Sequence, residues 1–111
     1  MTIVDYNVLI TFDLSYANSS DYRAVNSYLS EQGFEKLSHK GNQLPGNTYL
    51  GTKSEVVGRF ETEIEVAVKL KKQIYAALKK SMNGSGLSSV VFVMVSPSLS
   101  TSYSCSKPID Y

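Results

Sequence analysis

The chain carries close to its start the stretch Asn7-Val8-Leu9-Ile10-Thr11-Phe12-Asp13-Leu14. Its β-branched and aromatic residues predict a strand over about Tyr6 to Leu14, with both faces largely buried. Burial on both faces indicates a central place in a sheet. Asp13 then lies at or near the end of this strand, where small α+β domains often build their sites.

Composition favours one ordinary globular domain, because 111 residues with 42% apolar content can fill a single core. Eleven basic and ten acidic side chains leave a formal charge of +1, so nucleic acid or an anionic membrane would have to bind a local patch. A lone Cys105 and the lack of a signal-like start predict a reducing, cytoplasmic setting. We expect no membrane span, because no apolar run approaches the length that one requires.

The next segment predicts a helix that Ser19 or Ser20 caps and Gly33 ends. Its apolar positions recur at helical spacing: Tyr22, Val25, Tyr28 and Leu29. We expect a short strand over Phe34 to Ser38, an exposed loop over residues 39–47, and a returning strand over Thr48 to Thr52.

A second helix has the clearest start signal, since Thr62-Glu63-Ile64-Glu65 fits a capping box. Its apolar stripe runs toward Asn83-Gly84, which supplies a stop. The segment Ser54 to Glu61 can extend the preceding strand, form a hairpin end or start this helix early, and the Thr62 cap favours the extended form. Leu87 to Val95 then has the composition of a second central strand.

The order strand, helix, strand, strand, helix, strand predicts a ferredoxin-like βαββαβ fold, with an antiparallel sheet and two helices on one face. The right-handed crossover rule puts the first and last strands beside one another in the middle of the sheet. We assign residues 1–96 to this domain. Residues 97–111 form a separate Ser-rich C-terminal segment. Serines alternate with other residues from Ser96 to Ser106, which fits either an edge strand or a disordered Ser-rich tail.

Several of these segments resemble the Cas-two-like group, which contains small CRISPR adaptation nucleases, VapD-type toxin ribonucleases and uncharacterised relatives. The segments that carry the resemblance are Val8 to Leu14, the loop into the helix at Tyr22, Leu29-Ser30-Glu31-Gln32-Gly33-Phe34, Asn47 to Thr52 and the closing valine-rich strand.

The resemblance implies a homodimer in which a C-terminal fifth strand joins the sheet of the partner. It also implies that an Asp from each protomer approaches a divalent ion, Mg²⁺ or Mn²⁺, at the dimer seam. Asp13 matches that position and is the candidate catalytic and metal-binding residue, provided that it is exposed. Two facing carboxylates and a substrate phosphate can hold Mg²⁺ where one carboxylate cannot. The alternative is that Asp13 ends the strand and bonds loop amides.

Lysines of the second helix form a candidate nucleic-acid surface. Lys69, Lys72, Lys79 and Lys80 lie mostly opposite its apolar stripe and can contact phosphates in a sequence-independent way. The alternative is a solvated helix face, with lysines favoured near the negative C-terminal end of the helix. Tyr16, in the loop beyond Asp13, and Tyr49 can stack bases or join an interface.

Three functions therefore stay open. The first is a dimeric metal-dependent endoribonuclease or a factor associated with RNA or DNA. The second is a non-catalytic domain that binds a protein partner through a sheet edge or the Ser-rich segment, such as a phage or mobile-element inhibitor of a host complex. The third is a small-ligand domain. The single His39, in a Gly/Lys/Asn loop, is either an acid or base or a solvated bystander.

Overall fold

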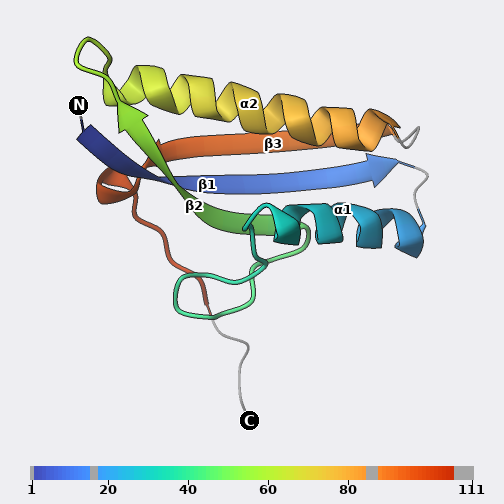
Figure 1. Cartoon of the computed structure of the whole chain (residues 1–111). Helices are drawn as coiled ribbons and strands as arrows, with labels where there is room; N and C mark the ends of the chain where they lie inside the picture. Colours follow the sequence, from blue (N-terminus) through green and yellow to red (C-terminus); the bar gives the residue numbers. More distant parts are fainter. Residues whose placement is uncertain (1, 16–17, 85–87, 107–111) are drawn as a thin grey trace.

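The computed structural model describes residues 2–15, 18–84 and 88–106. In chain order the elements are β1 (Thr2–Ser15), α1 (Ser19–Glu31), β2 (Thr48–Val57), α2 (Glu63–Gly84) and β3 (Ser88–Pro97), followed by a 3₁₀ turn at Ser98–Ser100 (Figure 1). This confirms an α+β chain with two helices and an antiparallel sheet. None of the described helices is long and apolar enough to cross a membrane.

The sheet has three strands in the order β2-β1-β3, and both pairings are antiparallel. Leu9 of β1 lies opposite Leu50 of β2 and Met94 of β3, so β1 is central as predicted. The expectation of a second central strand is wrong for the described residues, because β3 pairs with β1 alone and forms an edge. The first and last strands are nevertheless neighbours, as expected.

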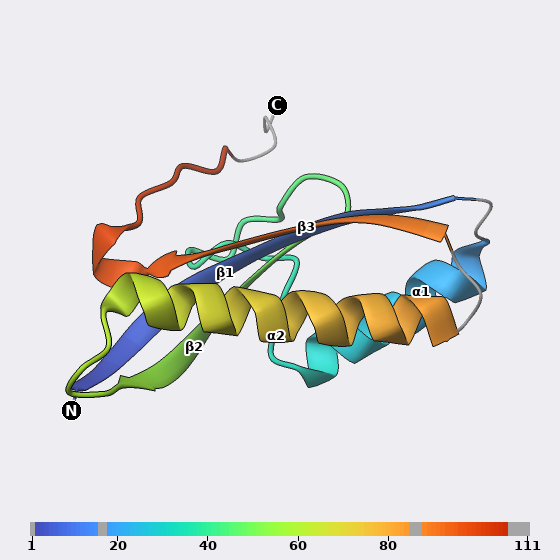
Figure 2. The same ribbon diagram turned by 90° about the horizontal axis from the view of Figure 1, so that it is seen from above.

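Side chains alternate between the two faces of β1, and one face holds the core. Its even-numbered residues from Tyr6 to Leu14 are buried and cluster with Val25 of α1 and Leu78 of α2. Both helices lie on this side of the sheet, whereas the segment at 101–106 lies on the other side (Figure 2). We call the second side, which carries Asn7, Leu9, Thr11 and Asp13 of β1, the open face.

The open face corrects the prediction that both faces of the first strand are largely buried. Asn7 is buried, but Leu9 and Thr11 are only half-buried and Asp13 is exposed. The physical reason is that two helices suffice to cover one face only.

Both helices begin with a capping box, one of which was predicted. For α2, the Glu65 N–H donates to Thr62 Oγ1 (3.1 Å) and the Thr62 N–H donates to Glu65 Oε1 (3.2 Å), as expected. For α1, Asn18 is the cap in place of Ser19 or Ser20. The Asp21 N–H donates to Asn18 Oδ1 and the Asn18 N–H to Asp21 Oδ2, both over 3.0 Å. Asn18 stands at the spacing from an acidic residue that this motif needs.

The segment predicted as a short strand, Phe34 to Ser38, makes two isolated bridges. Glu35 pairs with Leu50 on β2, and Leu37 pairs with Gln43 inside the following loop. The chain turns back on itself after Ser38, where the Gly41 N–H donates to the Ser38 carbonyl (2.9 Å) and Gly41 has a φ of 83°. Pairing with β2 therefore stops after one residue, and the full βαββαβ order is not shown.

The two uncertain segments have distinct outcomes. Ser54 to Val57 extend β2, as preferred, and a turn follows in which the Glu61 N–H donates to the Gly58 carbonyl (3.1 Å). Residues 101–106 form no strand within the chain, and they run along the open side of the sheet. Residues 107–111, the rest of the predicted C-terminal segment, lie outside the described residues.

Candidate functional site

Asp13 lies near the C-terminal end of β1, on the open face and opposite Val90 of β3. Its side chain is exposed, and Oδ1 accepts a hydrogen bond from the Tyr22 hydroxyl of α1 (3.2 Å). The same hydroxyl lies 3.3 Å from both the backbone nitrogen and the carbonyl oxygen of Leu14. Tyr22 therefore fixes the carboxylate at the strand end, and no loop amide among the described residues bonds to it.

One chain by itself does not supply a metal site in the part that the structure describes. No group of three or more His, Cys, Asp or Glu side chains lies close enough there to hold an ion. Asp13 contributes a single carboxylate, which is too few oxygen ligands for Mg²⁺ or Mn²⁺. The donor set that the described residues of one chain provide thus does not fit a bound cation.

The four predicted lysines of α2 divide into two groups. Lys69 bonds Glu61, and this contact raises the pKa of Lys69 and lowers that of Glu61. Lys79 Nζ donates to the Ser89 carbonyl (3.2 Å) and to Ser89 Oγ (2.9 Å). Lys72 and Lys80 are exposed. Half of this basic surface is therefore occupied within the chain.

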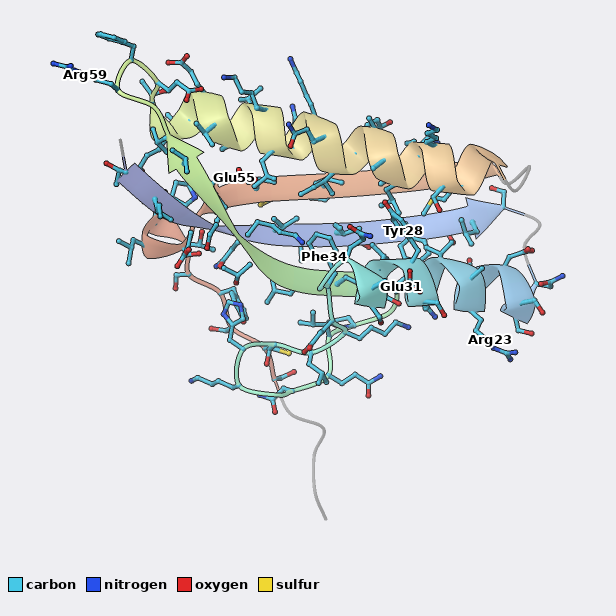
Figure 3. All side chains as sticks on the ribbon, in the orientation of Figure 1. Arg23, Tyr28, Glu31, Phe34, Glu55 and Arg59 are labelled. Atoms are coloured by element: carbon cyan, nitrogen blue, oxygen red, sulfur yellow. The ribbon has the colours of Figure 1, made fainter. Side chains whose placement is uncertain are left out.

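Lys79 stands at the same end of the sheet as Asp13, but on the face that the helices cover. Its partner Ser89 lies opposite Leu14, the neighbour of Asp13, so both side chains stand at one end of the sheet. The two arginines do not together add positive charge at this end of the sheet. Arg23 on α1 and Arg59 in the β2–α2 turn lie far apart and point away from the molecule (Figure 3).

The two predicted tyrosines gain no stacking role from the structure. Tyr16 lies outside the described residues. Tyr49 is buried in the core, where its hydroxyl donates to Asn26 Oδ1 of α1 and burial raises its pKa. Tyr49 is therefore a core residue, because its position on β2 faces the helices.

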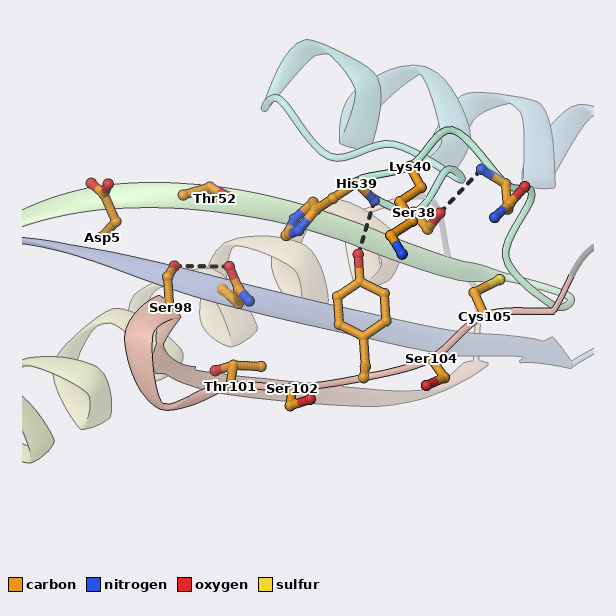
Figure 4. Close-up of a pocket in the computed structure, with 13 residues that line it drawn as sticks. Asp5, Ser38, His39, Lys40, Thr52, Ser98, Thr101, Ser102, Ser104 and Cys105 are labelled. Carbon is orange, nitrogen blue, oxygen red and sulfur yellow. Dashed lines mark hydrogen bonds between the residues drawn. The ribbon is translucent and has the colours of Figure 1, made fainter.

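A cavity of about 700 Å³ opens on the other half of the open face, and we call it the polar groove. Its floor comprises Asp5, Asn7 and Thr52, and its walls are the loop at 38–42 and the segment at 98–105 (Figure 4). The Tyr103 hydroxyl links the walls, because it accepts from the backbone N–H of His39 (2.9 Å), 64 positions away in sequence. The two rings meet edge-on at 5.5 Å.

Sequence reasoning missed this groove. A first signal of the groove was Asn7, a polar residue inside the apolar stretch that predicts the central strand. The alternating serines after Ser96 were a second signal, which the sequence did not connect with His39. Comparisons with family models, with curated proteins and with solved structures found no match to this chain.

Proposed function

We propose that this chain is a homodimeric, Cas-two-like protein that acts on RNA or DNA as a metal-dependent endonuclease or a nucleic-acid-associated factor. One observation carries the proposal: Asp13 is exposed at the end of the central strand, on a sheet face that no helix covers. Lys72 and Lys80 of α2 support it, because both are exposed and an ammonium group attracts phosphate.

The apolar half of the open face supports the dimer. Val90, Phe92 and Met94 of β3 are 72%, 48% and 50% exposed and line up beside Leu9. Burying a large apolar side chain contributes about 1.5–3 kcal/mol. Burial of these side chains against the same face of a second chain would therefore stabilise a dimer. A two-fold interface places the same patch on both protomers, which brings the two Asp13 side chains toward one seam.

The cation belongs to the dimer in this proposal. Two Asp13 carboxylates and a substrate phosphate provide the oxygen ligands that one chain lacks, and Mg²⁺ or Mn²⁺ would neutralise charge on the phosphate. The chain's own contribution is to hold each carboxylate in place through the Tyr22 hydroxyl.

The finer fold forms part of the same proposal. The Glu35–Leu50 bridge occupies the edge of β2 away from β1, where the second strand of a ferredoxin-like sheet would pair. We therefore propose a ferredoxin-like domain over residues 1–96 whose second strand is reduced to this bridge. The segment at 101–106 forms no strand within the chain, and a cytoplasmic setting suits this function.

The test is cleavage of labelled single-stranded RNA, single-stranded DNA and duplex DNA with Mg²⁺, Mn²⁺ or EDTA. Asp13→Asn should abolish a metal-dependent cleavage while leaving the circular dichroism spectrum unchanged. Glu55→Gln, which alters another strand carboxylate, is the matched control and should cleave normally. Absence of cleavage by the wild-type protein, or equal cleavage by Asp13→Asn, would refute the nuclease.

A specific observation favours one second candidate, a non-catalytic domain that binds a protein. Among the described residues, the outer edge of β3 has no strand partner and lies beside exposed Phe92 and Tyr75. Such an edge can accept an extended segment of another protein. This function predicts that the protein binds its partner equally well with EDTA and after Asp13→Asn. Pull-downs with the wild-type protein and with the Asp13→Asn variant would reveal such binding.

A further inference from the structure

The polar groove lies away from Asp13, and it carries an inference of its own. Asp5 and Asn7 on its floor stand at the opposite half of β1, and the eight positions from Asp5 to Asp13 span about 26 Å of strand. We propose that the groove binds a neutral ligand with vicinal hydroxyl groups, either a free sugar or the ribose of a nucleoside. This proposal does not depend on nuclease activity.

The floor of the groove presents a buried amide with a free donor. Asn7 is 9% exposed, and its Oδ1 accepts from Ser98 Oγ (2.8 Å). Its Nδ2 has no hydrogen-bond partner in the described part of the chain, where no fully buried side-chain nitrogen or oxygen lacks one. The Asn7 amide nitrogen therefore keeps some exposed surface, and because Asn7 lines the groove, an acceptor on a ligand there would satisfy it.

The walls offer groups that both donate and accept. The hydroxyl-bearing residues that line the groove include Thr52, Ser98, Thr101, Ser102 and Ser104. Asp5 adds an exposed carboxylate whose Oδ1 bonds the Ser54 hydroxyl. Sugar hydroxyls have the same double capacity, so they can match this lining in several pairings. An apolar ligand would leave the Asn7 amide nitrogen without a partner.

Charge favours a neutral ligand over an ion. Among the described residues that line it, the groove has one carboxylate, Asp5, and one ammonium group, Lys40, and they come from its floor and its loop wall. An anion drawn to Lys40 meets Asp5, and a cation drawn to Asp5 meets Lys40. A ligand without charge avoids both penalties and keeps its hydrogen bonds.

Size and shape agree with a small molecule. A volume of about 700 Å³ lies within the range of small-molecule sites. Tyr103 is 42% exposed and contributes an aromatic ring whose hydroxyl is already fixed by the His39 N–H. Such a ring can pack against the C–H face of a sugar while the polar groups hold the hydroxyls.

The experiment is a titration of the full ¹⁵N-labelled chain by NMR with glucose, galactose, ribose, uridine and 2′-deoxyuridine. We expect saturable shifts at Asn7, Ser98 and Tyr103 with at least one sugar or with uridine. Binding of uridine but not 2′-deoxyuridine would identify ribose as the source, and binding of a free hexose would identify a saccharide.

Variants test whether the floor amide recognises the ligand. Asn7→Asp keeps the shape and Oδ1 but removes the donor, so affinity should fall about tenfold or more. Glu31→Gln, on the exposed surface of α1, is the matched control and should bind like the wild type. If Asn7→Asp does not fold, Asp5→Asn at an exposed position replaces it, with the same expected loss.

Three results would overturn the proposal. The first is the absence of shifts with every compound of the panel. The second is an equal response to inorganic phosphate, which would assign the groove to anions. The third is unchanged affinity in the folded Asn7→Asp or Asp5→Asn variant.

Discussion

Gly51 lets Phe34 close against the sheet because it has no side chain. It lies on β2 opposite Val8 and faces the helices. A Cβ at this position would lie 2.5 Å from Phe34 Cδ1 and 3.1 Å from the Gly33 carbonyl oxygen. Phe34 is almost fully buried there, so the contact leaves little space for a methyl group.

Gly51→Ala should lower the free energy of unfolding by about 1–3 kcal/mol, because the added methyl group forces Phe34 or the backbone to move. Urea unfolding followed by circular dichroism measures this change. In a Phe34→Leu background the same substitution should cost less, since the obstructing ring edge is gone. An equal cost in both backgrounds would contradict the packing argument.

At the scale of the element, α1 depends on a cap that sequence reasoning placed one or two residues too late. Asn18 and Asp21 exchange two hydrogen bonds across the first turn, whereas Ser19 and Ser20 are helical. Ser, Asn and Asp all favour this position, so the segment Asn18-Ser19-Ser20-Asp21 offers several caps. The spacing of three to an acidic partner distinguishes Asn18.

Asn18→Ala should therefore destabilise the protein by about 1 kcal/mol, since it leaves the Asp21 N–H without its acceptor. Ser20→Ala is the matched control and should change stability by less than half as much, because Ala is a good helix former. Thermal unfolding of both variants checks the order. A larger loss of stability in Ser20→Ala than in Asn18→Ala would show that Ser20, and not Asn18, caps the helix.

Local signals predicted the elements well, and long-range pairing explains what they missed. The Thr62–Glu65 box and the central strand β1 follow from residues a few positions apart, so the sequence shows them directly. The short strand at Phe34 failed because its pairing depends on where the chain turns after Ser38. The polar groove was hidden because His39 and Tyr103 meet only in the folded chain. Asp13 was placed correctly at a strand end, but its exposure depends on which face the helices leave open.

At the scale of the whole molecule, the two faces of the sheet differ in what they bury. The helices cover one face, and the loop that contains Leu44 covers only part of the other, beside Leu9 and Leu50. The β3 side chains Val90, Phe92 and Met94 stay exposed. An apolar surface of this kind on a sheet is typical of an interface.

Phe92→Ser should shift a dimer toward monomer at micromolar concentration, because the substitution removes apolar area from the middle of the proposed interface. Size-exclusion chromatography with light scattering measures the association state. Phe60→Ser is the matched control, because Phe60 is 93% exposed in the β2–α2 turn, away from the open face. A wild-type monomer, or a dimer that Phe92→Ser leaves intact, would refute the open-face interface.

The central place of β1 also has a consequence during synthesis on the ribosome. Tyr6 lies opposite Lys53 on one side and opposite Pro97 on the other, so β1 acquires its second neighbour only after β3 has been translated. The intervening ~90 residues take several seconds or more at about 5–20 residues per second. During that interval the central strand of the protein has only part of its sheet, and the nascent chain is then most exposed to chaperones and to aggregation.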